Sequence, residues 1–296
     1  MNDAAKLASI VLEVSNQKTI SRGDGKYYPR TSAVSRCPRD MVFHRYGEPW
    51  SDPPEASWGT QLRFDQGHDG EERMIAKLEE AGIPVECQQM EVFNTTPGGI
   101  KVLGHMDGIA IVPHEDPRTG EPMPLGGKWY VIDVKTAGKY MYSKTYSPTE
   151  SKVSLNYRQQ VSLYSEAVVQ DSNYPDINGY KVSDLHFEGY EFGGGLIVYL
   201  AVDRPTKGYG EKKVDLPKIH ICQFDIDPVE VEVWLEDTYD LVEDHYRNET
   251  VPAIPDSGDE VVWNGIRCST RWCQRYSVCQ GLVEPVNPKL KEVLHG

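Results

Sequence analysis

Residues 129–136, which read WYVIDVKT, place two charged side chains inside a run of strand-forming residues. Aromatic and β-branched residues dominate this run, and that composition predicts a buried strand. Asp133 and Lys135 are two positions apart, so their side chains point to the same face of the strand. Because burying an unpaired charge is costly, the two groups either neutralise each other or share a third partner, such as a metal ion and a phosphate.

Periodicity and turn residues predict the remaining elements. Helices are expected over residues 38–46, 60–81, 151–170 and 227–248, and strands over 84–93, 100–112, 129–136 and 195–203. The last helix begins at a capping-box sequence, Asp227-Pro228-Val229-Glu230. This mixed order of strands and helices predicts an α/β layered fold. We expect a single domain over residues 1–296.

The overall charge argues against a protein that coats nucleic acid non-specifically, because the chain has a net charge of −14. Residues 126–160 nevertheless hold six basic and two acidic side chains, whereas residues 223–260 hold thirteen acids and one arginine. The acidic stretch predicts a solvated outer helix. A run of 18 or more apolar residues is absent, which predicts a cytoplasmic protein without a membrane span.

A second acidic residue lies in the run LGHMDGIAIV, where Asp107 stands beside Gly104 and Gly108. If Asp107 and Asp133 lie on neighbouring strands, their carboxylates form an oxygen-ligand site for Mg²⁺ or Mn²⁺. Such ions polarise a phosphoryl oxygen and activate water. Lys135 would then orient the water and stabilise the developing negative charge. The alternative is an Asp–Lys ion pair without a metal.

Three further residues accompany this strand pair. His68, in FDQGHDGEER, lies in the helix that precedes the strands and is a candidate metal ligand, although a lone histidine is commonly just polar surface. Gln160 and Tyr164 lie four residues apart and share one helix face. Gln160 can steady the lysine or a DNA phosphate, and Tyr164 can stack on a base. Taken alone, this motif fits a core tyrosine with a surface glutamine better.

As an ordered set, the motifs GH (67–68), GHMDG (104–108), IDVKT (132–136) and QVSLY (160–164) resemble the RecB-type branch of the PD-(D/E)xK nuclease superfamily. The resemblance runs from about residue 35 to the end of the chain. It implies a restriction-endonuclease-like mixed β-sheet flanked by helices, with a nuclease core over residues 60–203. It further implies Mg²⁺ or Mn²⁺ bound by His68, Asp107, Asp133 and the Val134 carbonyl, with Lys135 as the catalytic lysine.

The cysteines extend the resemblance to iron–sulfur relatives, including the CRISPR-associated Cas-four exonuclease family. Cys37 precedes the core, while Cys268, Cys273 and Cys279 follow it. The resemblance implies a [4Fe–4S] cluster that joins the N- and C-terminal segments, 35–59 and 250–285, through four thiolates. The tail has four residues between its first two cysteines where the family has two, so a Cys₄ Zn²⁺ site is the alternative and unrelated thiols a third. Cys87 and Cys222 are expected to be ordinary buried thiols.

The function implied is a metal-dependent DNA exonuclease that hydrolyses phosphodiester bonds at single-stranded or frayed ends. By resemblance, it would serve with recombination, repair or CRISPR adaptation proteins, and it could be phage-encoded. The cluster segments carry Arg36, Arg39, Arg271 and Arg275, which are candidates for DNA-phosphate contacts. The alternatives are a non-catalytic DNA-binding or scaffolding subunit that retains the fold, and a sequence- or structure-specific endonuclease.

Overall fold

The computed structural model describes most of the chain, in two compact units. The described residues are 27–51, 58–116, 118–138, 142–143, 145–146, 153–169, 190–203, 205–207, 214–253, 262–263, 266–267, 273 and 275–295. The sheet unit comprises the described residues of Pro29–Ser35 and Asp69–Asp240. The terminal unit comprises Tyr27 and Tyr28 with the described residues of Arg36–His68 and Leu241–Gly296.

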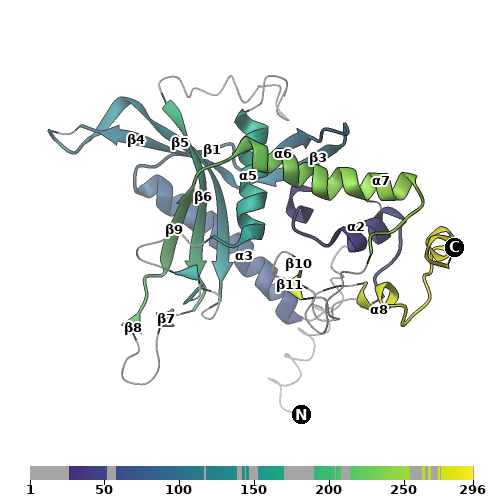
Figure 1. The fold of residues 1–296 in the computed structure, drawn as a ribbon. Helices are drawn as coiled ribbons and strands as arrows, with labels where there is room; N and C mark the ends of the chain where they lie inside the picture. Colours follow the sequence, from purple (N-terminus) through teal and green to yellow (C-terminus); the bar gives the residue numbers. More distant parts are fainter. Residues whose placement is uncertain are drawn as a thin grey trace, which may run out of the picture. The chain divides into compact units, whose positions relative to one another are not determined.

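The sheet unit is built on a five-stranded mixed sheet in the order β1-β4-β5-β6-β9 (Figure 1). Strands β5 and β6 are parallel, whereas the other neighbouring pairs are antiparallel. Two further antiparallel pairs, β2 with β3 and β7 with β8, belong to the same unit. The strands are β1 (Val85–Glu86), β2 (Met90–Thr95), β3 (Lys101–Met106), β4 (Gly108–Glu115), β5 (Pro122–Ala137), β6 (Tyr190–Ala201), β7 (Thr206–Lys207), β8 (Val214–Asp215) and β9 (Ile219–Phe224).

Helices cover both faces of this sheet. Helix α5 (Leu155–Val169) crosses one face, where Val161 and Tyr164 pack in the same core as Val131 and Ile197 (Figure 1). Helix α3 (Trp58–Glu80) covers the other face from Asp69 onward; its Met74, Ile75 and Leu78 share a second core with Ile132, Val134 and Val198. The alternation of Val131, Ile132, Asp133 and Val134 between the two faces follows from the two-residue period of a strand. The predicted α/β fold with a mixed sheet and flanking helices is thus confirmed.

The predicted strands differ from the observed ones mainly at their ends and interruptions. The runs 84–93 and 100–112 are each broken in two, at residues 87–89 and at Asp107. Strand β5 begins seven residues before the predicted start at 129, and β6 begins before 195. The sheet also continues past the predicted core boundary at 203, since β9 pairs with β6.

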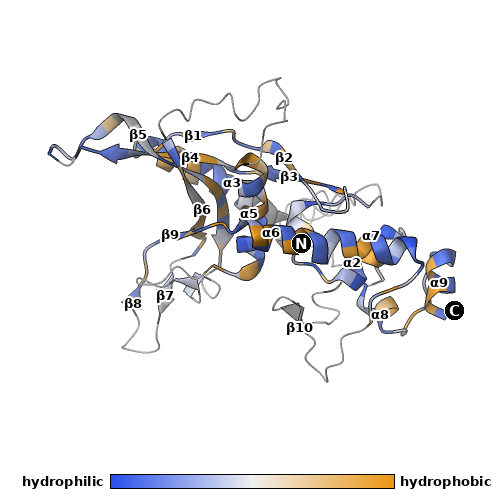
Figure 2. Cartoon of the chain, turned by 45° about the horizontal axis from the view of Figure 1, so that its top comes forward, coloured by the Kyte–Doolittle hydropathy of each residue, from blue (hydrophilic) through white to orange (hydrophobic). Residues whose placement is uncertain are grey.

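The predicted acidic helix is present as α6 (Pro228–Leu235), a π-helical turn η4 (Glu236–Asp240) and α7 (Leu241–Arg247). Asp227 caps it, because its carboxylate accepts the Val229 N–H at 3.0 Å. Glu230 instead pairs with Arg158 on α5 at 2.8 Å, so the capping box is only half formed. Figure 2 shows both hydrophobic and hydrophilic residues along this segment, and Val231, Leu235, Tyr239 and Val242 recur at helical spacing and are buried. The helix is therefore amphipathic and only in part a solvated face.

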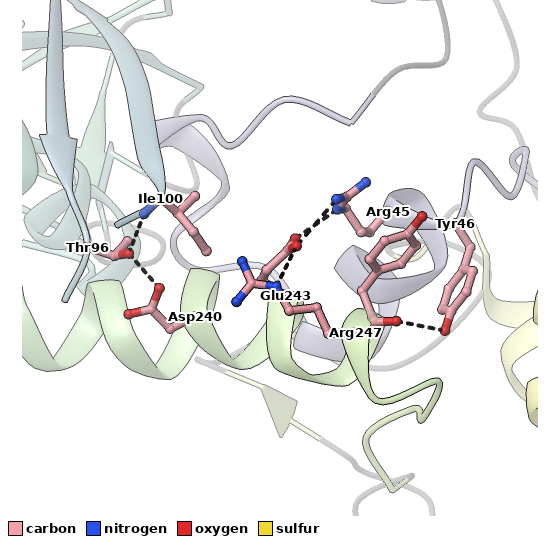
Figure 3. A network of polar contacts seen from close by, with 8 residues as sticks. Arg45, Tyr46, Thr96, Ile100, Asp240, Glu243 and Arg247 are labelled. Carbon is pink, nitrogen blue, oxygen red and sulfur yellow. Dashed lines mark hydrogen bonds and ion pairs between the residues drawn. The ribbon is translucent and has the colours of Figure 1, made fainter. Parts of the chain in front are cut away.

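Asp240 anchors the β2–β3 hairpin of the sheet unit. Its carboxylate accepts hydrogen bonds from the Thr96 hydroxyl and, at 2.8 Å, from the Gly98 N–H (Figure 3). The Thr96 hydroxyl also accepts the Ile100 N–H. A turn whose backbone and side-chain donors share one carboxylate is held in a single conformation.

The terminal unit is small and mainly helical. Around α2, Arg45 pairs with Glu243 of α7 at 3.0 Å and lies 3.9 Å from the centre of the Tyr246 ring (Figure 3). Such a cation between a carboxylate and an aromatic face ties two helices together. Besides α7, the terminal unit contains α2 (Pro38–Arg45), β10 (Val262–Trp263), β11 (Ile266–Arg267), α8 (Tyr276–Cys279) and α9 (Pro288–His295). The short helix η1 (Thr31–Ala33) belongs to the sheet unit. Within the described residues, no helix is both long and apolar enough to cross a membrane.

Gly104 is a tightly packed backbone position near the predicted site. A β-carbon there would lie 2.5 Å from a Tyr164 ring atom and 2.6 Å from the Thr31 hydroxyl. We expect Gly104→Ala to lower the free energy of unfolding by about 1–3 kcal/mol, because the core must shift to admit it. Gly138→Ala is the matched control, since a β-carbon at that position would meet nothing within 4 Å. Equal denaturant midpoints for the two variants would contradict this packing.

Candidate metal centre

The centre lies where the long β-hairpin bends from the five-stranded sheet into the β2–β3 ribbon. On one arm, the chain turns between β1 and β2 through Cys87 and Gln89, which both have positive φ. On the other arm, Asp107 separates β3 from β4. Three residues on one arm, 87–89, thus face two on the other, 107–108, as in a β-bulge. Bulges redirect side chains, and this one releases Asp107 from the strand ladder.

Asp107 is directed at β5. Its Oδ2 accepts the backbone N–H of Val134 at 2.7 Å. Ladder pairing between β4 and β5 starts at Gly108 and Ile132, so the Val134 N–H lies just beyond it. The Asp107 carboxylate therefore takes the place of the missing strand partner. This bond brings the carboxylates of Asp107 and Asp133 to neighbouring positions, as the sequence predicts.

Asp133 and Lys135 form the predicted pair on the α5 face of the sheet. Lys135 Nζ lies 2.6 Å from Asp133 Oδ2, and Asp133 is 1% exposed while the lysine side chain is 21% exposed. The contact is an ion pair of poor hydrogen-bond geometry, because Oδ2 has no well-aligned donor among the described residues. The buried carboxylate oxygen thus retains capacity for a further electrophilic partner.

The electrostatics of the three groups are coupled. Burial raises the pKa of Asp107 to about 7; the Asp133 carboxylate adds to this rise, whereas Lys135 and the Val134 N–H oppose it. Burial also raises the pKa of Asp133, against the opposing effect of Lys135. Burial favours the neutral form of Lys135, but the Asp133 and Asp107 carboxylates outweigh it and raise its pKa. Two buried acids with one lysine leave a site that gains from a second cation.

Helix α5 adds the predicted glutamine and tyrosine. Gln160 donates to the Tyr164 hydroxyl at 2.9 Å. Tyr164 is 3% exposed, and burial raises its pKa to about 12, so its ring belongs to the core. Its hydroxyl still senses the charges of Asp133, Lys135 and Asp107. The pair therefore borders the centre, with Gln160 fixing the hydroxyl rather than reaching the lysine.

Two residues of the site were not predicted. The Lys135 ammonium lies 5.3 Å from the centre of the Tyr157 ring, at the start of α5. The Glu71 carboxylate of α3 raises the pKa of Asp107 and accepts a hydrogen bond from Gln89 at the bulge. Glu71 follows His68 by three residues on one helix face, and this spacing is the signal that would have identified it. His68 itself is exposed and immediately precedes the sheet unit, so its role as a ligand stays a prediction.

The donor set of Asp107 and Asp133 fits a hard divalent cation. Carboxylate oxygens are the ligands that Mg²⁺ and Mn²⁺ prefer, and the buried Asp133 Oδ2 has no well-aligned hydrogen-bond donor among the described residues. Among the described residues, no group of three or more His, Cys, Asp or Glu side chains is arranged to hold a metal. The two aspartates are therefore the part of the predicted ligand set that the structure brings together.

Three of the four predicted cluster cysteines are described, and all belong to the terminal unit. Cys37 precedes α2, Cys273 precedes α8 and Cys279 ends α8; each is half-buried. Arg39 on α2 donates to the Cys279 sulfur, with Nε 3.1 Å from Sγ. The N- and C-terminal cysteine segments are thus in direct contact. Cys268 lies outside the described residues. Cys222 is buried, as expected of a structural thiol, whereas Cys87 lies at the bulge.

The predicted phosphate-binding arginines have different environments. Arg275 is 2% exposed, pairs with Asp40 at 3.0 Å and donates to the Glu48 carbonyl, so its guanidinium is committed within the protein. This corrects the prediction that it contacts DNA. Arg39 is likewise engaged, by Cys279 and the Pro252 carbonyl. Arg36 is exposed, and Arg271 lies outside the described residues.

Comparison with known proteins adds little to this geometry. No model of a protein family matches the chain, and no curated protein matches it. Among solved structures, the chain is similar to one titled "Crystal structure of SSO0001", with 16% identity, a TM-score of 0.39, and coverage of 79% of this chain and 85% of that chain. A similarity of this degree carries no argument about function.

The raised pKa of Asp107 predicts how the metal-free protein responds to pH. The folded state holds the Asp107 proton up to about pH 7, whereas the unfolded state releases it near pH 4. The contribution of Asp107 to the free energy of unfolding therefore falls as the pH rises between these values and is fully lost above about 7. Asp107→Asn abolishes this loss while its amide oxygen can still accept the Val134 N–H.

With EDTA present, we expect Asp107→Asn to melt a few degrees above the wild type at pH 8. The advantage should shrink steadily as the pH falls toward 4. Asp116→Asn, in a partly buried turn whose carboxylate accepts the Arg118 N–H, is the control. Thermal melts showing the same pH response for wild type and Asp107→Asn would exclude a buried, protonated Asp107.

Proposed function

We propose that the chain is a Mg²⁺- or Mn²⁺-dependent DNA exonuclease with a RecB-type PD-(D/E)xK, restriction-endonuclease-like core. The observation that carries the proposal is the convergence of Asp107, Asp133 and Lys135 at the hairpin bend, with both carboxyl groups raised in pKa. Two buried acids can hold a divalent cation, which activates water and polarises a phosphoryl oxygen, and a neighbouring lysine can stabilise the developing negative charge.

In this role, Asp107 and Asp133 would hold the cation, with the Val134 carbonyl and His68 as the further predicted ligands. The bound ion supplies Lewis acidity toward a phosphoryl oxygen and lowers the pKa of water. Hydrolysis adds the water oxygen to phosphorus and breaks the phosphorus–oxygen bond to the leaving nucleotide, whose oxygen takes up a proton.

Lys135 acts as a donor in this reaction. Its pKa is raised by the two carboxylates, so the ammonium is fully protonated at neutral pH and cannot take a proton from water. An ammonium at this position orients the attacking water and stabilises the negative charge that develops on the phosphoryl oxygens. The Asp133 contact and the Tyr157 ring hold its position.

We expect end-labelled linear DNA to be degraded in the presence of Mn²⁺. Asp133→Asn and Lys135→Ala should each reduce the rate by about a hundredfold or more, because each removes a charge that acts on the transition state. Lys128 lies on the same strand, but it is exposed and pairs with Val112, away from the end of the strand that carries Asp133. Lys128→Ala should therefore leave the rate unchanged. Full activity in Asp133→Asn would refute the assignment.

Covalently closed circular DNA separates this proposal from its alternatives. An exonuclease leaves circles intact, whereas a sequence- or structure-specific endonuclease opens them. Binding of DNA without cleavage of any substrate would instead favour a non-catalytic subunit. The proposed physiological substrates are single-stranded or frayed ends, supplied by recombination, repair or CRISPR adaptation proteins.

The four cysteines are proposed to hold a [4Fe–4S] cluster, with Zn²⁺ as the alternative. Support comes from the direct contact between the N- and C-terminal segments, through Arg39 to Cys279 and through Arg275 to Asp40. A guanidinium donor stabilises the thiolate form that either group requires. The cluster would fix segments more than 230 residues apart in the sequence.

Anaerobically purified protein should therefore be brown, and Cys279→Ser should lose the colour and the bound iron. Cys222→Ser, which changes a buried thiol of the sheet unit, is the control and should retain both. Elemental analysis distinguishes iron from zinc. Protein that contains neither metal after anaerobic purification would refute this part of the proposal.

A further inference from the structure

A continuous row of aromatic rings leads away from Lys135 toward the edge of the sheet. Lys135, Tyr199 and His220 are direct partners on β5, β6 and β9, so they occupy one line across the sheet. Directly paired residues point to the same face. For Lys135 and Tyr199 this is the α5 face, where Tyr157 packs against both. The line ends at β9, an edge strand of the five-stranded sheet.

The rings follow one another in contact across the sheet. Ring centres are 6.3 Å apart from Tyr157 to Tyr199, 6.4 Å from Tyr199 to His220 and 4.9 Å from His220 to Tyr146. We define Tyr157, Tyr199, His220 and Tyr146 as the aromatic row. Tyr199 is 1% exposed and forms its floor, whereas the other three residues are half-buried.

The row is close to electrically neutral although the chain is acidic. Burial lowers the pKa of His220, so its ring is uncharged at neutral pH. Two cations lie next to the row: Lys135, which is paired with Asp133, at one end, and at the other the exposed Lys218, two residues before His220. Neutral aromatic faces between cations match a strand that alternates planar bases with phosphates.

We propose that the aromatic row is a base-stacking subsite for single-stranded DNA, along which unpaired bases lie while an adjacent phosphate reaches Lys135. This inference rests on the proposed function for the identity of the phosphate site. Only unpaired bases can stack on protein rings, because those in a duplex are already stacked on each other. The row thus selects frayed or single-stranded ends over blunt duplex.

Binding in Ca²⁺, which supports no cleavage in the assay, tests the row separately from the chemistry. The probes are a fluorescein-labelled oligothymidine of about twelve nucleotides and an abasic oligonucleotide of the same length, which has the phosphates but no bases. Fluorescence anisotropy should show that the wild type binds oligothymidine about tenfold or more tightly than the abasic strand, as expected for stacked bases.

Tyr146→Leu with Tyr157→Leu should bind both strands equally, whereas the corresponding Phe variants should retain the preference, since they keep the rings. Tyr190→Leu is the matched control: this half-buried tyrosine lies at the opposite end of β6 and should keep the preference. If the double variant does not fold, the single Tyr146→Leu variant decides the question. Rings that serve only core packing would leave the preference intact in the Leu variants.

A wild type that binds the two strands equally would overturn the inference. Cleavage in Mn²⁺ without a preference for bases would reject the row and leave the nuclease proposal standing. A base preference that the Leu variants abolish, without cleavage by the wild type, would support the row and reject the nuclease proposal.

Discussion

The placement of Asp133 and Lys135 within a central strand is the constraint on which the rest of the site depends. A carboxylate that is 1% exposed is tolerated only because the lysine lies 2.6 Å away. One lysine, however, does not balance the additional Asp107, which the hairpin bend holds against the Val134 N–H. The surrounding structure enforces this imbalance: α3 and α5 bury the strand from both faces, and the bulge directs the second acid inward.

Much of the fold could be predicted from local patterns because its central elements are strongly apolar. The 129–136 strand, the α5 helix and the helix that starts at Asp227 all follow from hydrophobic spacing or capping. The bend could not be predicted in this way. Cys87 and Gln89 adopt left-handed backbone conformations that neither residue type signals. Strand β9 was missed because Ile219 and Ile221 are exposed on an edge strand, where the alternation of burial is weak.

The roles of the side chains were predicted less well than the positions of the helices and strands. A sequence shows which residues are charged but not which groups they contact. Arg275 was expected to contact DNA, yet Asp40 and the Glu48 carbonyl bury it. Its neighbours Cys273 and Cys279 are thereby attached to the segment that begins at Cys37. Part of the acidic helix is likewise structural, since Asp240 fixes a turn and Glu243 pairs with Arg45. Tyr157 was missed because its relation to the site arises only in three dimensions, whereas the spacing of Glu71 from His68 was a sequence signal that was not used.

The proposed function depends on Asp107 and Asp133 sharing one divalent cation. Calorimetric titration with Mn²⁺ measures this binding, and a pH of about 7.5 keeps Asp107 ionised because it lies above the raised pKa of that group. We expect one Mn²⁺ to bind per chain in the wild type, and this binding to be lost in both Asp107→Asn and Asp133→Asn. Cys279→Ser should bind as the wild type does. Unchanged Mn²⁺ affinity in the two Asn variants, or no binding by the wild type, would contradict the account.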